Sequence, residues 1–180
     1  MKAAIALAAA ALLGVSAALP DKAPEKETMI DASFECAVPP RWTVTRGDQS
    51  VSFLGPRDEN EVASQISVRY VGPGDPSHKD ADAYIARLTA KSAVPMPGWK
   101  TGPVKPLAVA GRKARVVERD TSEFTPPAAM KAREVEMREV HVVVPAAKGF
   151  YAIVYYVPRS LDNKERPLFK AFLASFKPKI

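Results

Sequence analysis

The chain has 180 residues, of which 47% are hydrophobic and 26% charged, and a formal net charge of +6. These values fit one ordinary globular domain or two small ones, and they exclude a wholly disordered chain, a collagen and a coiled coil. A single cysteine, Cys36, excludes an internal disulfide framework and any zinc site with several cysteines. The charge is too small to indicate a nucleic-acid-binding protein, so we expect no nucleic-acid partner.

The first 17 residues have the pattern of a secretory signal peptide. Lys2 supplies a positive charge, an uncharged run of Ala, Ile and Leu follows it, and Val15-Ser16-Ala17 offers small residues before a cleavage site. A retained membrane anchor is the alternative, but the apolar stretch is Ala-rich and at the lower limit of length for a span. We therefore expect cleavage after Ala17, export to the periplasm or extracellular space, and no transmembrane segment after processing.

Cys36 also raises the alternative of a lipid-anchored protein. It lies far beyond the apolar run, however, and bulky Phe34 and charged Glu35 precede it. Cys36 alternates with Phe34 and Val38, as one face of a strand does. We therefore expect a buried small hydrophobic residue, with an intermolecular disulfide as the less favoured reading.

Residues 18–28 are rich in proline and charge and predict a short flexible leader. Alternating apolar residues then predict strands at 34–38, 42–44, 51–53 and 62–70. After residue 80 the apolar period becomes helical. Asp80 is a natural N-cap for this helix, and Lys91 falls in its expected last turn.

The second half of the chain repeats this order of strands followed by a helix. Strands are expected at 107–110 and 112–119, a loop at 124–129, a long strand from Arg133, and a central strand at 150–157. The apolar positions of the long strand change from odd to even, which predicts a β-bulge near Glu139. A final helix is expected from an Asn163 cap, with Pro167 near its first turn. We expect an α+β single domain over residues 29–177, with a central antiparallel sheet flanked by helices.

This layout resembles the PsbP family, named for an extrinsic photosystem II subunit, and its bacterial relatives. The similar residues span nearly the whole mature chain. They are Phe34-Glu35-Cys36-Ala37-Val38-Pro39 with Trp42, Val51-Ser52-Phe53-Leu54-Gly55-Pro56, the helix of Tyr84, Gly98-Trp99, Gly111 with Ala114, Gly149-Phe150-Tyr151-Ala152-Ile153, and Phe172-Leu173-Ala174-Ser175-Phe176-Lys177-Pro178. The resemblance implies a PsbP-like sandwich. It carries no function, because its fold relatives range from photosystem subunits to a nuclear Ran-binding protein.

The sequence contains no nucleotide-binding loop, nucleophile elbow, HExxH or CxxC motif. Potential metal ligands cluster at one place, and each of them also has an ordinary role at the entry of a helix. These residues are Asp75, His78, Asp80 and Asp82. We favour the helix-entry reading and expect no metal and no cofactor.

Other polar and aromatic residues have a structural reading that we favour over a catalytic one. His141 lies between two valines and predicts a strand histidine on a polar or secondary face. Glu134, Glu136 and Glu139 could supply paired carboxylates for glycoside hydrolysis, but they interleave with arginines as on a solvated strand face. Trp42 and Trp99 could line a ligand groove, but packing at the core rim is expected.

Positive charge is concentrated in two segments, with net charges of +6 over residues 79–115 and +4 over residues 159–180. Arg87 and Lys91 are expected on one outward helical face, and Lys170 and Lys177 on another. We hypothesise that these residues form basic surfaces facing an acidic envelope protein or an anionic lipid surface. Dispersed solubilising charge is the simpler alternative.

The leading functional hypothesis is an exported, non-catalytic domain that binds a partner in the cell envelope. One alternative is a carrier of a small molecule or lipid in a cleft between sheet and helix. Another is a hydrolase with dispersed catalytic residues. A large apolar cavity would favour the carrier. An exposed patch on a closed core would favour the binding module, and a cleft holding carboxylates with strongly shifted pKa values would favour the enzyme.

Overall fold

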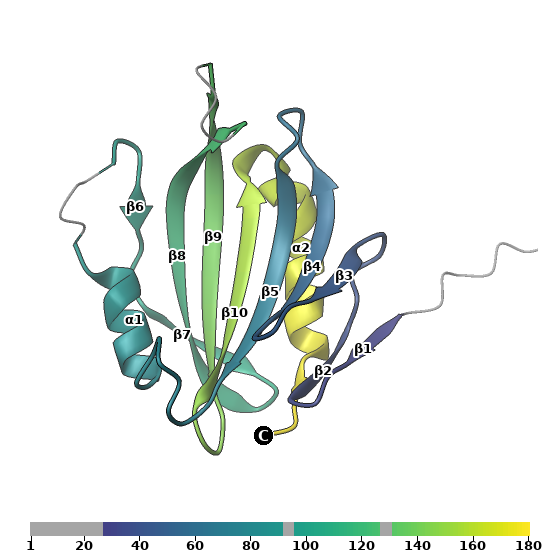
Figure 1. Ribbon diagram of the computed structural model, residues 1–180, viewed down its shortest axis with the longest axis vertical. Coiled ribbons are helices and arrows are strands. Elements are labelled where there is room, and N and C mark those ends of the chain that lie inside the picture. Colours follow the sequence, from purple (N-terminus) through teal and green to yellow (C-terminus); the bar gives the residue numbers. More distant parts are fainter. Residues whose placement is uncertain (1–26, 92–95, 127–130) are drawn as a thin grey trace, which may run out of the picture.

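A computed structural model describes residues 27–91, 96–126 and 131–180. The expected signal peptide and leader residues 18–26 lie outside this part of the chain. The described residues form an eight-stranded sheet, a three-stranded sheet and two helices (Figure 1). The elements are β1 (Thr28–Ile30), β2 (Phe34–Ala37), β3 (Thr43–Arg46), β4 (Val51–Arg57), β5 (Ala63–Val71), α1 (Ala81–Thr89), β6 (Lys100–Thr101), β7 (Lys105–Val109), β8 (Arg112–Thr125), β9 (Arg133–Pro145), β10 (Phe150–Pro158), α2 (Arg159–Ser175) and β11 (Lys177–Pro178).

The large sheet has the order β3-β4-β5-β10-β9-β8-β6, with β7 also paired to β8, and every pairing is antiparallel. The central position of β10 confirms the strand predicted at 150–157. Its Tyr151, Ile153 and Tyr155 pack in the main core cluster together with the aromatic side chains of α2. Its Phe150 and Ala152 pack with α1 in a second cluster. Because alternate strand residues point to opposite faces, α1 and α2 cover opposite faces of the sheet. The predicted α+β domain with a central antiparallel sheet is confirmed.

The small sheet joins the two ends of the described chain, because β2 pairs with both β1 and β11. Thr28, placed in the leader by composition, lies in β1 and pairs with Ala37. Beyond residue 177 the Lys179 N–H donates to the Ser33 carbonyl at 2.8 Å. The small sheet therefore includes Thr28 and is contacted by Lys179, two residues just outside the expected range of 29–177.

Helix α1 begins as expected, since the Asp80 carboxylate accepts a hydrogen bond from the Ala83 N–H at 2.7 Å. Its buried residues are Tyr84 and Ile85. The helix ends at Thr89, however, so the expectation that Lys91 lies in the last turn is wrong. Ala90 already has extended backbone, which ends the helical hydrogen bonding.

Helix α2 begins at Arg159, four residues before the expected cap at Asn163. Pro158 ends β10 and leads directly into the helix, so no loop separates the two elements. Pro167 consequently lies in the helix interior rather than in its first turn. Phe169 and Phe172 are buried on the face of the helix that packs in the main core cluster. The helix ends at Ser175, so Lys177 lies in β11 and not on a helical face.

The predicted β-bulge near Glu139 is wrong. The register of β8 against β9 is continuous from Thr125↔Arg133 to Arg115↔Val143. The apolar positions change parity because burial changes face along the strand. Val140, Val142 and Val144 belong to the main cluster. Val135 and Met137, on the other face, pack with Val62 and Tyr156. Strand β8 also continues to Thr125, through the expected start of a loop at 124, because β9 pairs along its whole length.

Candidate functional site

The four candidate metal ligands lie near the start of α1, and each has another role. His78 accepts a hydrogen bond from the Arg87 guanidinium at 3.0 Å. Asp75 forms an ion pair with Arg69 at 2.7 Å, and Asp82 forms one with Arg115 at 2.6 Å. Asp80 caps the helix. Within the described residues, no three His, Cys, Asp or Glu side chains are grouped so that they could hold a metal ion.

A chain of buried polar groups crosses from α1 to the sheet. The Tyr84 hydroxyl lies 2.9 Å from His141 Nδ1, and His141 Nε2 lies 3.1 Å from Glu139. Glu139 also accepts hydrogen bonds from Arg119 and Thr121. Although burial raises the pKa of the Glu139 carboxyl, the hydrogen bond to His141 and the Arg119 charge outweigh it and hold that pKa below its usual range. An ionised Glu139 only accepts, so His141 Nε2 donates to it.

This chain contains the residue types of a catalytic triad, but its hydroxyl is poorly suited to nucleophilic attack. Tyr84 is only 7% exposed, and burial raises the pKa of its hydroxyl. An activated nucleophile needs a lowered pKa or an accessible position beside a base. The network therefore acts as a connection that fixes α1 on the sheet.

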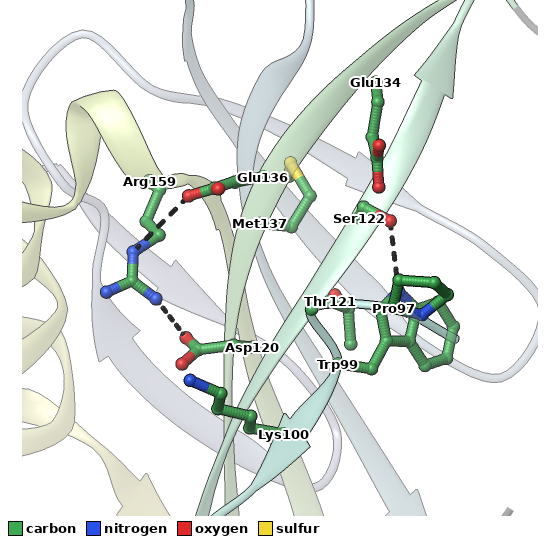
Figure 2. A pocket seen from close by; sticks show the side chains of 11 residues that line it. Pro97, Trp99, Lys100, Asp120, Thr121, Ser122, Glu134, Glu136, Met137 and Arg159 are labelled. Atoms are coloured by element: carbon green, nitrogen blue, oxygen red, sulfur yellow. Dashed lines mark hydrogen bonds and ion pairs between the residues drawn. The ribbon is translucent and has the colours of Figure 1, made fainter. Parts of the chain in front are cut away.

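An open pocket of about 590 Å³ lies at the end of the sheet near the start of α2. We call it the Trp99 pocket. Its lining comprises residues 97–100 at β6, 120–122 of β8, Glu134 with residues 136–137 of β9, and Arg159 of α2. Figure 2 shows Trp99 and Ser122 on one side of the pocket and Arg159 with Glu136 on the other. Trp99 is 40% exposed and its indole N–H donates to the Ser122 hydroxyl at 3.0 Å, which orients the ring. The expectation that Trp99 packs at the core rim is wrong.

The charges of the Trp99 pocket are unequally neutralised. Asp120 lies 2.6 Å from Arg159 and 2.8 Å from Arg138, so two guanidinium groups balance its charge. Glu136 has only a 3.9 Å approach to Arg159, and its side chain is 80% exposed. A general acid of a glycosidase is kept protonated by an apolar environment, which an exposed carboxylate does not have. The Glu136 carboxylate therefore lacks the environment of a glycosidase general acid.

The other tryptophan is a core residue. Trp42 is 5% exposed, and a Cβ added at Gly55 would overlap its indole ring. The absence of a side chain at Gly55 lets the ring lie flat on the backbone of β4. Trp42 therefore packs in the core, as the sequence favoured for both tryptophans, whereas Trp99 is exposed.

The four basic residues of the sequence hypothesis occupy separate places. Arg87 is on α1, where its guanidinium donates to His78 Nε2 at 3.0 Å, and Lys91 follows the helix. Lys170 is exposed on α2, across the sheet from α1. Lys177 forms an ion pair with Glu35 at 3.1 Å. Lys177 therefore does not share a helical face with Lys170, and Lys91 lies beyond the end of the helix that carries Arg87.

A second concave region is apolar. A groove of about 600 Å³ lies between α2 and the segment that follows β2, with Val38, Pro39, Leu168 and Phe172 among its lining residues. Its wall is the same helix face that packs on the sheet, since Phe172 is also part of the main core cluster. The groove is thus continuous with the core.

Cys36 is buried as expected, with a 1% exposed side chain. Burial, with the neighbouring Glu35 charge, raises the pKa of its thiol to about 12. The thiol is therefore protonated and inert at neutral pH.

No protein-family model matches the sequence, and no curated protein is similar to it in sequence. Solved structures are similar in fold. Cyanobacterial PsbP (CyanoP) from Synechocystis sp. PCC 6803 has a TM-score of 0.51 and 11% identity, over 91% of this chain and 98% of that one. LpqN of Mycobacterium tuberculosis, described as involved in cell envelope biogenesis, has a TM-score of 0.53 and 12% identity, over 86% and 90%.

A structure from Bacteroides thetaiotaomicron also matches, with a TM-score of 0.51 and 12% identity over 86% of this chain. This chain spans only 49%, about half, of the Bacteroides chain. Within the described residues, no helix combines the length and apolar character needed to cross a bilayer. The resemblance expected from the sequence is confirmed at the level of the fold: the chain has the PsbP-like α+β architecture.

Proposed function

We propose that the protein is an exported, non-catalytic domain that binds a partner protein of the cell envelope at the Trp99 pocket. The observation that carries this proposal is an indole ring 40% exposed beside an open, charged pocket, on a domain whose core aromatic residues are almost fully buried. Exposed tryptophans surrounded by polar groups are typical of binding hot spots. The envelope description of LpqN supports the location, and the amino-terminal signal pattern supports export.

The site chemistry supports a non-catalytic role. The buried hydroxyl of Tyr84 has a raised pKa, and the Glu136 carboxylate faces solvent. Neither group has the environment that acid–base or nucleophilic catalysis requires. Binding needs only shape, an aromatic anchor and complementary charge, which the Trp99 pocket supplies.

The proposal is tested by capture from the native envelope with tagged full-length protein. Trp99→Ala should reduce recovery of the partner at least tenfold, since truncating a hot spot costs about 2 kcal/mol or more. Val104→Ala is the matched control, because Val104 is 42% exposed and lies outside the pocket. Equal recovery with Trp99→Ala and wild type would show that the partner binds elsewhere.

A carrier of lipid or another apolar small molecule is the second candidate, because the groove beside α2 is apolar and continuous with the core. In that case an acyl chain would lie between Leu168 and Pro39. A fluorescent fatty acid should then bind to the wild-type protein. It should bind much more weakly to the variant Ala171→Trp, in which a bulky side chain fills the groove. Absence of binding at micromolar probe would remove this candidate.

A further inference from the structure

The outer edge of β8 is open beside the Trp99 pocket. Strand β7 pairs with residues 112–116 of β8, and β6 pairs only with Arg119 and Asp120. The chain before β6 makes a turn, in which the Trp99 N–H donates to the Met96 carbonyl at 3.1 Å and Gly98 has a positive φ of 81°. Within the described residues, no strand pairs with Thr121–Thr125 on the side opposite β9. Exposed strand edges are templates for pairing with another chain.

The backbone groups of this edge can be assigned from the neighbouring hydrogen bond. The Gly102 N–H donates to the Glu118 carbonyl at 2.8 Å, so the polar groups of Glu118 point away from β9. Backbone direction alternates along a strand. The N–H and carbonyl groups of Ser122 and Phe124 therefore also point outward, and together they offer four hydrogen-bonding groups.

Two exposed aromatic residues flank these groups. Trp99 lies at one end, hydrogen-bonded to Ser122, and Phe124 at the other is 47% exposed. An extended chain laid along Ser122–Thr125 would follow the line of β6 beyond Trp99. It would then cover apolar surface at the same time as it satisfies the backbone.

The charge beside the edge identifies the chemistry of such a chain. Glu136 lies directly opposite Ser122, and Glu134 directly opposite Phe124, so both carboxylates share the face of these two side chains. Both glutamates are exposed, whereas Asp120 is already balanced by Arg138 and Arg159. A strand added to β8 would lie two strands from β9, at about 10 Å. Every second side chain of that strand would share the face of the two glutamates, and long Lys or Arg side chains could reach their carboxylates across β8.

We propose that β8 receives an extended segment of the partner protein by strand addition, with Lys or Arg at alternate positions facing Glu134 and Glu136. This inference rests on the proposed function and adds the binding mode and the charge of the partner.

The test uses wild-type protein labelled with ¹⁵N and the peptide acetyl-Lys-Thr-Lys-Thr-Lys-Thr-amide at millimolar concentration. We expect chemical-shift changes at the backbone amides of Ser122 and Phe124 and at the Trp99 indole. Two peptides with N-methyl groups on alternate nitrogens, in the two possible phases, are the controls. One phase should bind at least tenfold more weakly, because it blocks the hydrogen bonds to β8.

Charge is tested in the same assay. The matched peptide with Glu in place of Lys should not bind. The double variant Glu134→Gln, Glu136→Gln should bind the Lys peptide more weakly, and its binding should depend less on salt concentration. Unchanged shifts with the Lys peptide, or equal binding of both methylated phases, would overturn strand addition. Equal binding of the acidic peptide would overturn the basic partner. Shifts at Ser122 that depend on protein concentration without peptide would show that a second copy occupies the edge, and would also overturn the proposal.

The envelope capture tests the proposed function, and the peptide titration tests the strand-addition mode, so their outcomes can be told apart. Envelope capture that depends on Trp99, with no peptide effect at β8, would leave the binding function standing and overturn only the strand mode. Peptide binding at β8 without Trp99-dependent capture would instead show that the envelope partner does not bind at the Trp99 pocket, which contradicts the proposed function.

Discussion

His78 lies in a setting that opposes its protonation. The ring is 7% exposed and packs edge-on against Tyr84, with ring centroids 4.8 Å apart. Arg87 donates to Nε2, and an arginine cannot accept a hydrogen bond, so this nitrogen carries no proton. Burial, with the charges of Arg87 and Arg69, holds the pKa of His78 below its usual range.

This lowered pKa predicts a loss of stability on acidification. A histidine whose pKa is lower in the folded state contributes stability above its unfolded pKa of about 6.5, and this contribution is lost as the pH falls through the folded pKa. The free energy of unfolding of wild type should therefore fall more between pH 7 and pH 5 than that of His78→Gln. Urea unfolding at several pH values gives the free energy of unfolding of both proteins. The titrating groups that the two proteins share contribute equally to both, so the difference reports on His78. If the free energies of unfolding of the two proteins depended on pH in the same way, protonation of His78 would not destabilise the fold.

At the scale of elements, α2 holds the main core together through its aromatic face. Phe172 packs edge-on against Phe53 at a centroid distance of 5.0 Å, and Phe169 stacks on Tyr155 at 4.7 Å. These contacts join the helix to β4 and β10. Phe172 is 1% exposed, so truncation to alanine would remove packing contacts of the core.

We therefore expect Phe172→Ala to lower the free energy of unfolding by about 3–5 kcal/mol, because the substitution removes a buried ring and leaves a cavity in the core. Phe124→Ala is the matched control: it removes the same ring from a site 47% exposed and should change stability by about 0.5 kcal/mol or less. Chemical denaturation gives both values. A midpoint for Phe172→Ala equal to that of the control would mean that α2 does not dock through this face.

The elements also show where sequence patterns suffice. The helical spacing of Tyr84 and Ile85 and the Asp80 cap predicted the start of α1, because local periodicity and capping decide it. The Asn163 cap gave the wrong start for α2, because the helix begins directly after Pro158. The helix holds Pro167 in its interior, where packing of Phe169 and Phe172 offsets the local cost of the proline. The odd-to-even change in β9 predicted a bulge because a single strand pattern does not tell which face each partner covers.

At the scale of the whole molecule, the candidate site depends on the order of strands in the sheet. The Trp99 pocket joins segments near residues 98, 121, 136 and 159, which come together only because β8 lies between β6 and β9. No local motif connects them, so the sequence could propose Trp99 as a groove residue but not its exposure. The same topology separates Arg87 from Lys170 by placing their helices on opposite faces, which residue counts along the chain could not reveal.

The central claim is that a partner contacts the Trp99 pocket and the outer edge of β8. Hydrogen–deuterium exchange of the protein, free and in complex with the partner captured from the envelope, tests it most directly. The account predicts slower exchange on binding at the outward amides of Ser122 and Phe124, with little change in α1 and α2. Protection confined to the exposed faces of those helices, around Arg87 or Lys170, would contradict it and restore the basic residues as the binding surface.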